Sequence, residues 1–223
     1  MTVTQPPSVA KQTLRDRARA GAEPVARGFG RLGLSPNALT FIGFVFAFVA
    51  ASFAAVQLWL PAGLLVAIGA SFDMLDGALA RATNKLSRLG AFLDSTIDRA
   101  GEAVVYVGIA IGSMANYPSG AVLAMAAAFM VSYTRARAES LGFASGKGLA
   151  GVGLAPREVR VVILVVGLLA IGLSGGLPSG FAPFSDTTAI SWLILTLGLI
   201  TILATITTIQ RIVYVYLQAK KEQ

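Results

Sequence analysis

Six long apolar stretches, separated by short polar or turn-rich segments, dominate the chain. A helix needs roughly 20 mostly apolar residues to cross a bilayer, and each stretch is close to that length. The segment "NYPSG" at 116–120, between the third and fourth stretches, carries proline and glycine turn signals. The pattern predicts an all-α integral membrane protein with six transmembrane helices, at about residues 39–60, 62–80, 89–113, 119–141, 159–176 and 187–210 or a little beyond.

The composition agrees with a membrane protein and removes several classes of chemistry. Of the 223 residues, 55% are hydrophobic and 13% are charged, and the mean hydropathy is +0.72. Soluble domains carry about 25% charged residues. The chain has no cysteine and no histidine, which excludes disulfides, thiolate metal sites and Ser-His-Asp catalysis. Any acid–base chemistry must therefore use Asp, Glu, Lys, Tyr or water.

The basic residues are confined to alternate connections. The 18 lysines and arginines lie before the first stretch, near the second-to-third connection, around the fourth-to-fifth connection and after the sixth stretch. Cytoplasmic loops carry an excess of Lys and Arg. An even number of spans with both termini in the cytoplasm satisfies this rule, whereas an odd number scatters the charges over both faces. We therefore expect a multi-pass plasma-membrane protein whose active site opens to the cytoplasm.

Residues 1–38 differ from the membrane domain predicted at 39–223. Residues 11–32 mix basic and apolar residues, which predicts an amphipathic helix lying on the anionic leaflet; a solvated basic arm is the alternative. Ser35 is placed to cap the next helix, with Pro36 at its first position. The start of the chain lacks the apolar region of a cleaved signal peptide. The predicted order is therefore a tail, an interfacial helix and the six-helix domain.

Four aspartates lie at the facing ends of the second and third stretches. Asp73 and Asp76 are three residues apart near the end of the second stretch, and Asp94 and Asp98 are four residues apart near the start of the third. Residues at these spacings share one face of a helix. The two helices are joined by a short polar turn, so they run antiparallel. All four carboxylates are therefore expected at one depth, just inside the cytoplasmic boundary.

Four neighbouring carboxylates repel one another and need either protons or cations. Oxygen-only ligands favour a hard ion such as Mg²⁺ or Mn²⁺, and a pair of ions roughly 3.5–4 Å apart suits phosphoryl transfer. Gly77 and Gly90 allow a ligand to approach closely, and Arg81 can pair with a phosphate. Two alternatives stay open: salt bridges between these acids and nearby arginines, and a cation transporter with an intramembrane carboxylate pathway.

The stretch from Asp73 to Asp98 has the form D-x-x-D-G-x-x-A-R-x8-G-x-x-x-D-x-x-x-D. It resembles the signature of the CDP-alcohol phosphotransferases, also called CDP-alcohol phosphatidyltransferases. The resemblance implies that an alcohol attacks the β-phosphate of a CDP-lipid and that CMP leaves. It further implies that Asp98 is the base that deprotonates the alcohol. Two divalent ions, Mg²⁺ or Mn²⁺, would be held by Asp73, Asp76, Asp94 and Asp98.

The same resemblance assigns residues to the CDP-lipid. Those positions are Asn37, Thr40, Asp73, Gly77, Arg81 and Ser87. Asn37 and Thr40, in "PNALT", would lie nearest the cytidine. Ordinary helix capping explains Asn37 and Ser87 equally well. A homodimer is expected from the family alone, and no nucleic-acid partner is predicted.

The sequence after the signature is similar to one subgroup of this family. The segments "SYTRARAESLG", "GVGLAPREVRVVI" and "TTIQRIVYVY" resemble the phosphatidylinositol-phosphate synthases of actinobacteria and the archaetidylinositol-phosphate synthases of archaea. That resemblance implies that Arg135, Arg160 and Arg211 bind the phosphate of inositol 1-phosphate. Arg135 departs from the bacterial pattern, which has lysine there, and so replaces a point donor with a planar fork.

Alternatives stay open for the acceptor and the lipid. The three arginines also obey the positive-inside rule, and Arg135 with Glu139 fits an ordinary helix salt bridge. Glycerol 3-phosphate is the second candidate acceptor within the family. The signature of that subgroup tends to end D-P-x-x-D-K, whereas Ser95 and Arg99 follow the last two aspartates here. Diacylglycerol esters and archaeal ether lipids are not distinguished, because the region that contacts them faces the bilayer.

Overall fold

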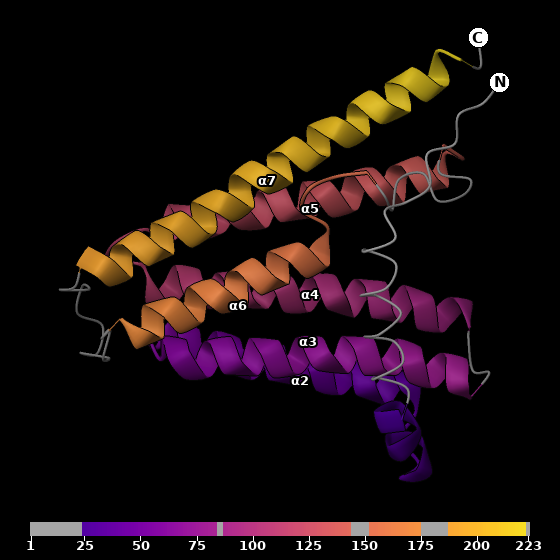
Figure 1. The fold of residues 1–223 in the computed structure, drawn as a ribbon, viewed down its shortest axis with the longest axis horizontal. Helices are drawn as coiled ribbons and strands as arrows, with labels where there is room; N and C mark the ends of the chain where they lie inside the picture. The colour runs from indigo at the N-terminus through magenta and orange to yellow at the C-terminus, as the bar shows by residue number, and fades with distance from the viewer. Residues whose placement is uncertain (1–23, 84–86, 144–151, 175–186, 222–223) are drawn as a thin grey trace. The chain divides into compact units, whose positions relative to one another are not determined.

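The computed structural model describes residues 24–83, 87–143, 152–174 and 187–221, and the regular structure within these ranges is entirely helical (Figure 1). Residues 24–31 are helical. The longer helices are α2 (Pro36–Ala55), α3 (Trp59–Ala82), α4 (Arg88–Gly112), α5 (Pro118–Ser140), α6 (Arg157–Leu173) and α7 (Thr187–Ala219). These six helices coincide with the six apolar stretches, and the all-α prediction is confirmed for the described residues.

The two ends of α2 show how the sequence sets helix boundaries. At its start, the Ser35 hydroxyl oxygen accepts the N–H of Ala38 at 3.2 Å, which is the predicted cap. Its end comes at Ala55, earlier than predicted. Gln57 adopts a left-handed backbone conformation with φ of 64°, and its Nε2 donates to the carbonyl of Gly112 at 2.8 Å. This anchored turn lacks proline and glycine, so sequence signals did not reveal it.

Three described helices, α2, α3 and α7, are long and apolar enough to cross a membrane. α4 carries charged residues throughout its first half, α5 ends in the charged segment "RARAES", and α6 has 17 residues. The predicted count of six crossings therefore stays a prediction. The interfacial helix also stays a prediction, because residues 11–23 lie outside the described residues.

The chain divides into two compact units. The first unit comprises Met1–Val45 and Ile68–Asp98, and the second comprises Phe46–Ala67 and Arg99–Gln223. Residues from α2, α3 and α4 contribute to both units. Each unit has its own group of buried apolar side chains.

In the first unit, residues 24–31 pack against parts of α2 and α3. Ala26, Leu39 and Leu79 are fully buried together. The rings of Phe29 and Phe72 are tilted against each other, with centroids 5.9 Å apart. The described part of the segment before α2 is thus held by protein contacts at the end of α3 that carries the acidic residues.

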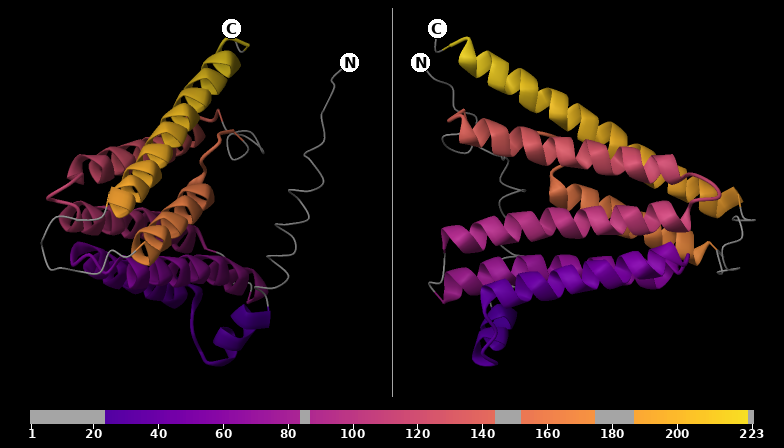
Figure 2. Two further views of the ribbon diagram at one scale, coloured as in Figure 1. Left: turned by 60° about the vertical axis from the view of Figure 1, so that its left-hand side comes forward. Right: turned by 180° about the vertical axis from the view of Figure 1, so that it is seen from behind.

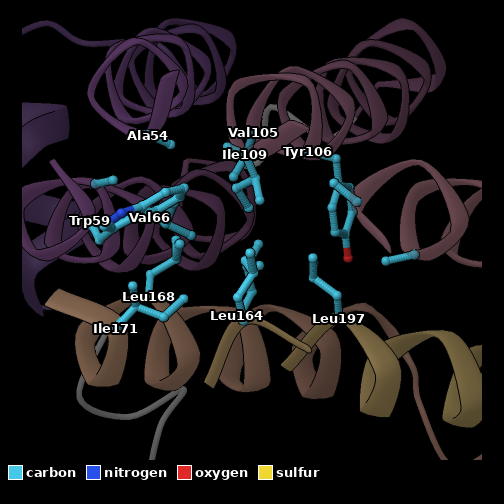
Figure 3. Packing of buried hydrophobic residues seen from close by; sticks show 14 of the residues in the cluster. Ala54, Trp59, Val66, Val105, Tyr106, Ile109, Leu164, Leu168, Ile171 and Leu197 are labelled. Atoms are coloured by element: carbon cyan, nitrogen blue, oxygen red, sulfur yellow. The ribbon is translucent and has the colours of Figure 1, made fainter. Parts of the chain in front are cut away.

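The larger apolar core belongs to the second unit and is seen in Figure 3. Its largest side chains include Trp59, Tyr106 and Leu168, each about 1% exposed. Side chains of α6 point toward those of α3 and α4 in this view. Helix α7 packs along α5 and α6 (Figure 1), and Figure 2 gives two further views of these helices.

Two glycines on one face of α4 permit a close helix crossing in the second unit. A Cβ atom on Gly108 would lie 2.3 Å from the carbonyl oxygen of Ala51, and one on Gly112 would lie 2.0 Å from that of Ala54. Both neighbours are backbone atoms of α2. Small residues four apart are the usual means by which membrane helices approach closely.

Candidate active site

The four aspartates predicted to bind metal all belong to the first unit. Asp73 and Asp76 lie in the second half of α3, and Asp94 and Asp98 lie in the first half of α4. The connection between the two helices is short, as the sequence predicts, because α3 ends at Ala82 and α4 begins at Arg88. Both acidic pairs therefore lie near the α3–α4 connection.

Asp76 is the best-defined member of this acidic group. Its side chain is buried, with 4% of the residue exposed. The hydroxyl of Thr40 donates to its Oδ2 at 2.6 Å, a length typical of a charge-assisted hydrogen bond. Asp73 and Asp94 are both close enough to Asp76 to repel its negative charge. The structure therefore brings three of the predicted carboxylates within electrostatic reach of one another.

Gly43 of α2 makes room for Asp73. A Cβ at this position would lie 3.0 Å from Asp73 Oδ1 and 3.3 Å from the carbonyl oxygen of Gly69. Gly43 was not among the residues predicted for the site. The available signal was a glycine inside an apolar helix, which costs about 1 kcal/mol relative to alanine and so suggests a close approach.

The available ligands fit a hard divalent cation, because they are all carboxylate oxygens. Asp76 is buried, and Asp73 and Asp94 lie near it. Across the described ranges, however, no three His, Cys, Asp or Glu side chains are close enough to share one ion as they stand. Holding one ion with three of these carboxylates therefore requires them to draw together. Like charges do this only when a cation offsets their repulsion.

The residues predicted to contact the nucleotide belong to the first unit, as the acidic group does. Ser87 accepts the backbone N–H of Gly90 at 2.9 Å, so it caps α4. A Cβ on Gly90 would lie 3.4 Å from Asn37 Oδ1, which places Asn37 beside the start of α4. A Cβ on Gly77 would likewise meet the Arg81 guanidinium at 3.4 Å. Ser87 thus caps α4 in this structure, and its contact with a nucleotide stays a prediction.

The basic trio lies in the second unit and its members have different surroundings. Arg135 is exposed and forms an ion pair with Glu139, with Nε 2.7 Å from Oε1; this is the helix salt bridge considered as an alternative. Arg160 is buried and paired with Glu102. Arg211 is also buried.

Arg211 is held by backbone oxygens. Its Nη1 donates to the carbonyl of Val131, and its Nε donates to that of Val152 at 3.2 Å. Within the described part of the chain it forms no ion pair with a carboxylate. Arg135, Arg160 and Arg99 are close enough to raise the electrostatic potential at its guanidinium. The predicted trio is thus gathered in one region, and Arg99 joins it.

Sequence reasoning missed the partners that hold these arginines. Glu102 pairs with Arg160, and Ser132 accepts a hydrogen bond from Arg99 at 2.9 Å. Glu102 is one turn beyond Asp98 on α4, and an acid in the middle of an apolar stretch was a usable signal. Its partner, 58 residues away, was not readable from local spacing.

The sequence pattern of the CDP-alcohol phosphatidyltransferases matches residues 33–210. The chain therefore belongs to the CDP-alcohol phosphatidyltransferase family, as its signature predicts. This makes it a membrane transferase of phospholipid synthesis, in a family that uses divalent metal.

Relatives with names come from archaea and bacteria. The archaetidylinositol phosphate synthase of Pyrococcus horikoshii is 39% identical over 156 residues, which are 70% of this chain and 80% of the relative. The phosphatidylinositol phosphate synthase of Cutibacterium acnes is 34% identical over 198 residues, which are 86% of this chain and 90% of the relative.

Solved structures give the same fold. Phosphatidylinositol phosphate synthase of Mycobacterium tuberculosis with CDP-DAG bound has a TM-score of 0.70 at 26% identity, covering 87% of this chain and 93% of that one. The structure of that enzyme in complex with manganese and citrate has a TM-score of 0.69 at 25% identity, covering 87% and 88%.

The Thr40–Asp76 hydrogen bond leads to a test of metal use. We expect Thr40→Val to raise the Mn²⁺ concentration needed for half-maximal activity by about tenfold or more, the usual effect of losing an outer-shell partner. Thr40→Ser, which keeps the hydroxyl, should behave like the wild type. Mn²⁺ binding, followed by electron paramagnetic resonance, should weaken in parallel. A change confined to the KM for CDP-lipid would show that Thr40 contacts the nucleotide without supporting the metal ligands.

Proposed function

We propose that this protein transfers a phosphatidyl-type group from a CDP-lipid to inositol 1-phosphate and releases CMP. The observation that carries the proposal is the similarity to relatives from two lineages, at 39% and 34% identity, that are named as inositol phosphate synthases. A neighbouring structure with CDP-DAG bound supports a CDP-lipid donor. The donor is CDP-diacylglycerol or its archaeal ether analogue.

In the proposed reaction, an acceptor hydroxyl oxygen forms a bond to the β-phosphorus of the CDP-lipid. The bond from that phosphorus to the CMP oxygen breaks, and the hydroxyl proton passes to Asp98. Two divalent ions, Mg²⁺ or Mn²⁺, supply charge neutralisation at the phosphates when they are bound. They would be held by Asp73, Asp76, Asp94 and Asp98. Thr40 supports this set by fixing the buried Asp76.

The CDP-lipid is proposed to bind beside the acidic group. Arg81 would pair with a phosphate, and Gly77 would leave space for the nucleotide. Asn37, Thr40 and Ser87 would contact the nucleotide as well. Their common location in the first unit with Asp73 supports this assignment.

The acceptor phosphate is proposed to bind to Arg135, Arg160 and Arg211. Buried positive charge that forms no ion pair with a carboxylate among the described residues, as at Arg211, favours an anionic ligand. We further propose that the protein is a homodimer of the plasma membrane, with its termini and active site on the cytoplasmic side.

An acceptor panel tests the proposal directly. Purified protein in detergent receives CDP-diacylglycerol, Mn²⁺ and one labelled acceptor: inositol 1-phosphate, free inositol or glycerol 3-phosphate. We expect labelled lipid and stoichiometric CMP only with inositol 1-phosphate. Product with glycerol 3-phosphate alone would make the protein a phosphatidylglycerol phosphate synthase. Cation flux in liposomes free of CDP-lipid, together with no product from any acceptor, would instead support a transporter.

Arg211 provides a more local test. We expect Arg211→Ala to raise the KM for inositol 1-phosphate by about tenfold or more, because a hydrogen bond to a charged group contributes about 1.5–3 kcal/mol. The KM for CDP-lipid should change little. Initial rates measured over both substrate concentrations separate the two effects. Equal changes in both KM values would remove Arg211 from the acceptor site.

A further inference from the structure

We propose that Glu102 is a positioning residue of the acceptor site, which orients Arg160 and Arg99 for the acceptor phosphate. The inference rests on the proposed function, because it assigns a role to a carboxylate that touches two arginines of the basic region. Glu102 itself contacts neither substrate in this proposal.

The contact between Glu102 and Arg160 is bidentate. Arg160 Nε donates to Glu102 Oε1 at 2.9 Å, and Arg160 Nη2 donates to Oε2 at 2.9 Å. Both side chains are buried, at 1% exposure for Arg160 and 4% for Glu102. Arg160 Nη1 also donates to the carbonyl of Ala155 at 3.1 Å. Three of the five N–H groups of the guanidinium are therefore engaged, and its orientation is fixed.

The same carboxylate reaches a second arginine. Arg99 Nη1 lies 3.6 Å from Glu102 Oε2 and donates to the hydroxyl of Ser132 on α5 at 2.9 Å. Glu102 on α4 is thus in contact with Arg160 on α6 and with Arg99, which connects to α5. Glu102 therefore connects α4 directly to α6, which carries Arg160, and through Arg99 to α5, which carries Arg135.

Removing this carboxylate affects anion binding in two opposite ways. Long-range electrostatics alone would strengthen the binding of a phosphate, because the region gains one positive charge. Loss of orientation would weaken phosphate binding. Without Glu102, Arg160 is repelled by Arg99 and Arg211 and leaves its fixed position. The sign of the change therefore separates a positioning role from a simple countercharge.

Glu139 supplies a matched control. It also pairs with an arginine of the trio, Arg135, but the two side chains are 46% and 49% exposed. Exposed ion pairs contribute little to structure. Glu139→Gln removes the same charge as Glu102→Gln from the same region without releasing a buried guanidinium.

The experiment compares the wild type, Glu102→Gln and Glu139→Gln. For Glu102→Gln we expect the KM for inositol 1-phosphate to rise by about ten- to a hundredfold, as when an outer-shell partner of a binding group is lost, with the KM for CDP-lipid nearly unchanged. Glu139→Gln should have an unchanged or lower KM for inositol 1-phosphate. A lowered or unchanged KM in Glu102→Gln would overturn the proposal, and so would an equal rise in both variants.

A second substitution tests the proposal in case the first variant does not fold. If Glu102→Gln does not yield folded protein, Glu102→Asp keeps the charge and shortens the reach, so the bidentate contact is lost. It should then show the raised KM for inositol 1-phosphate. A wild-type KM in folded Glu102→Asp would contradict the inference.

The wild-type protein shows whether the proposed function fails independently of the role of Glu102. If the wild type makes no lipid from inositol 1-phosphate, the acceptor assignment fails. The role of Glu102 is then tested with inorganic phosphate, by measuring how far phosphate raises the thermal unfolding midpoint of each protein. That increase should be smaller in Glu102→Gln or Glu102→Asp and retained in Glu139→Gln. Equal increases in all variants would overturn the positioning role.

Discussion

Replacing Asp98 by asparagine is expected to abolish turnover while leaving the fold intact. A general base contributes about a hundred- to ten-thousandfold to rate, and asparagine cannot accept the acceptor proton. Its amide oxygen still offers one neutral metal ligand, so Mn²⁺ binding should weaken and persist. Turnover is measured as CMP released with inositol 1-phosphate, and the fold is checked by circular dichroism and the thermal midpoint in detergent.

Ser95 provides the control for this prediction. It lies on the same helix and is exposed, and its hydroxyl donates to the Phe92 carbonyl of its own helix at 3.0 Å. Ser95→Ala should therefore have the turnover of the wild type. Activity of Asp98→Asn close to that of the wild type would remove Asp98 from the role of base.

Replacing Gly108 by alanine is expected to destabilise the second unit strongly. The added Cβ would lie 2.3 Å from the carbonyl oxygen of Ala51, 2.7 Å from its Cα and 2.8 Å from its carbonyl carbon. These are backbone atoms, so no side chain can rotate away and the two helices must separate. Overpacking of this kind costs about 1–3 kcal/mol, which corresponds to a thermal midpoint lowered by about 2–12 °C.

Gly198 on α7 separates this clash from the intrinsic preference of helices for alanine. A Cβ at Gly198 has nothing within 4 Å, and alanine is favoured over glycine in a helix by about 1 kcal/mol. Gly198→Ala should therefore leave the midpoint unchanged or raise it. A Gly108→Ala protein as stable as the wild type would show that α2 and α4 are not in close contact at this point.

The sequence predicts the helical architecture well because membrane helices carry a strong and simple signal. Runs of apolar residues locate all six long helices, and prolines and serines locate several of their starts. The end of α2 was missed because Gln57 forms a left-handed turn with no glycine or proline. The last helix was predicted to end at residue 210 or a little beyond, and α7 continues to Ala219.

The site is predicted unevenly, for a physical reason. Paired aspartates at helical spacing are a local pattern, so the acidic group was found from sequence. The hydrogen bond from Thr40 to Asp76 and the pairing of Glu102 with Arg160 join residues 36 and 58 positions apart. Such contacts depend on how helices pack, and no local spacing records them. Thr40 was singled out for a different reason, as a neighbour of the nucleotide.

The way Arg211 is held has a consequence for discrimination between alcohols. Carbonyl dipoles orient its guanidinium without cancelling its charge. Among the described residues this buried cation forms no ion pair with a carboxylate, so under the proposed function a phosphomonoester supplies negative charge to pair with it, whereas unphosphorylated inositol supplies none. We therefore expect the neutral alcohol to be rejected because it leaves the buried charge of Arg211 unpaired. No steric barrier is required.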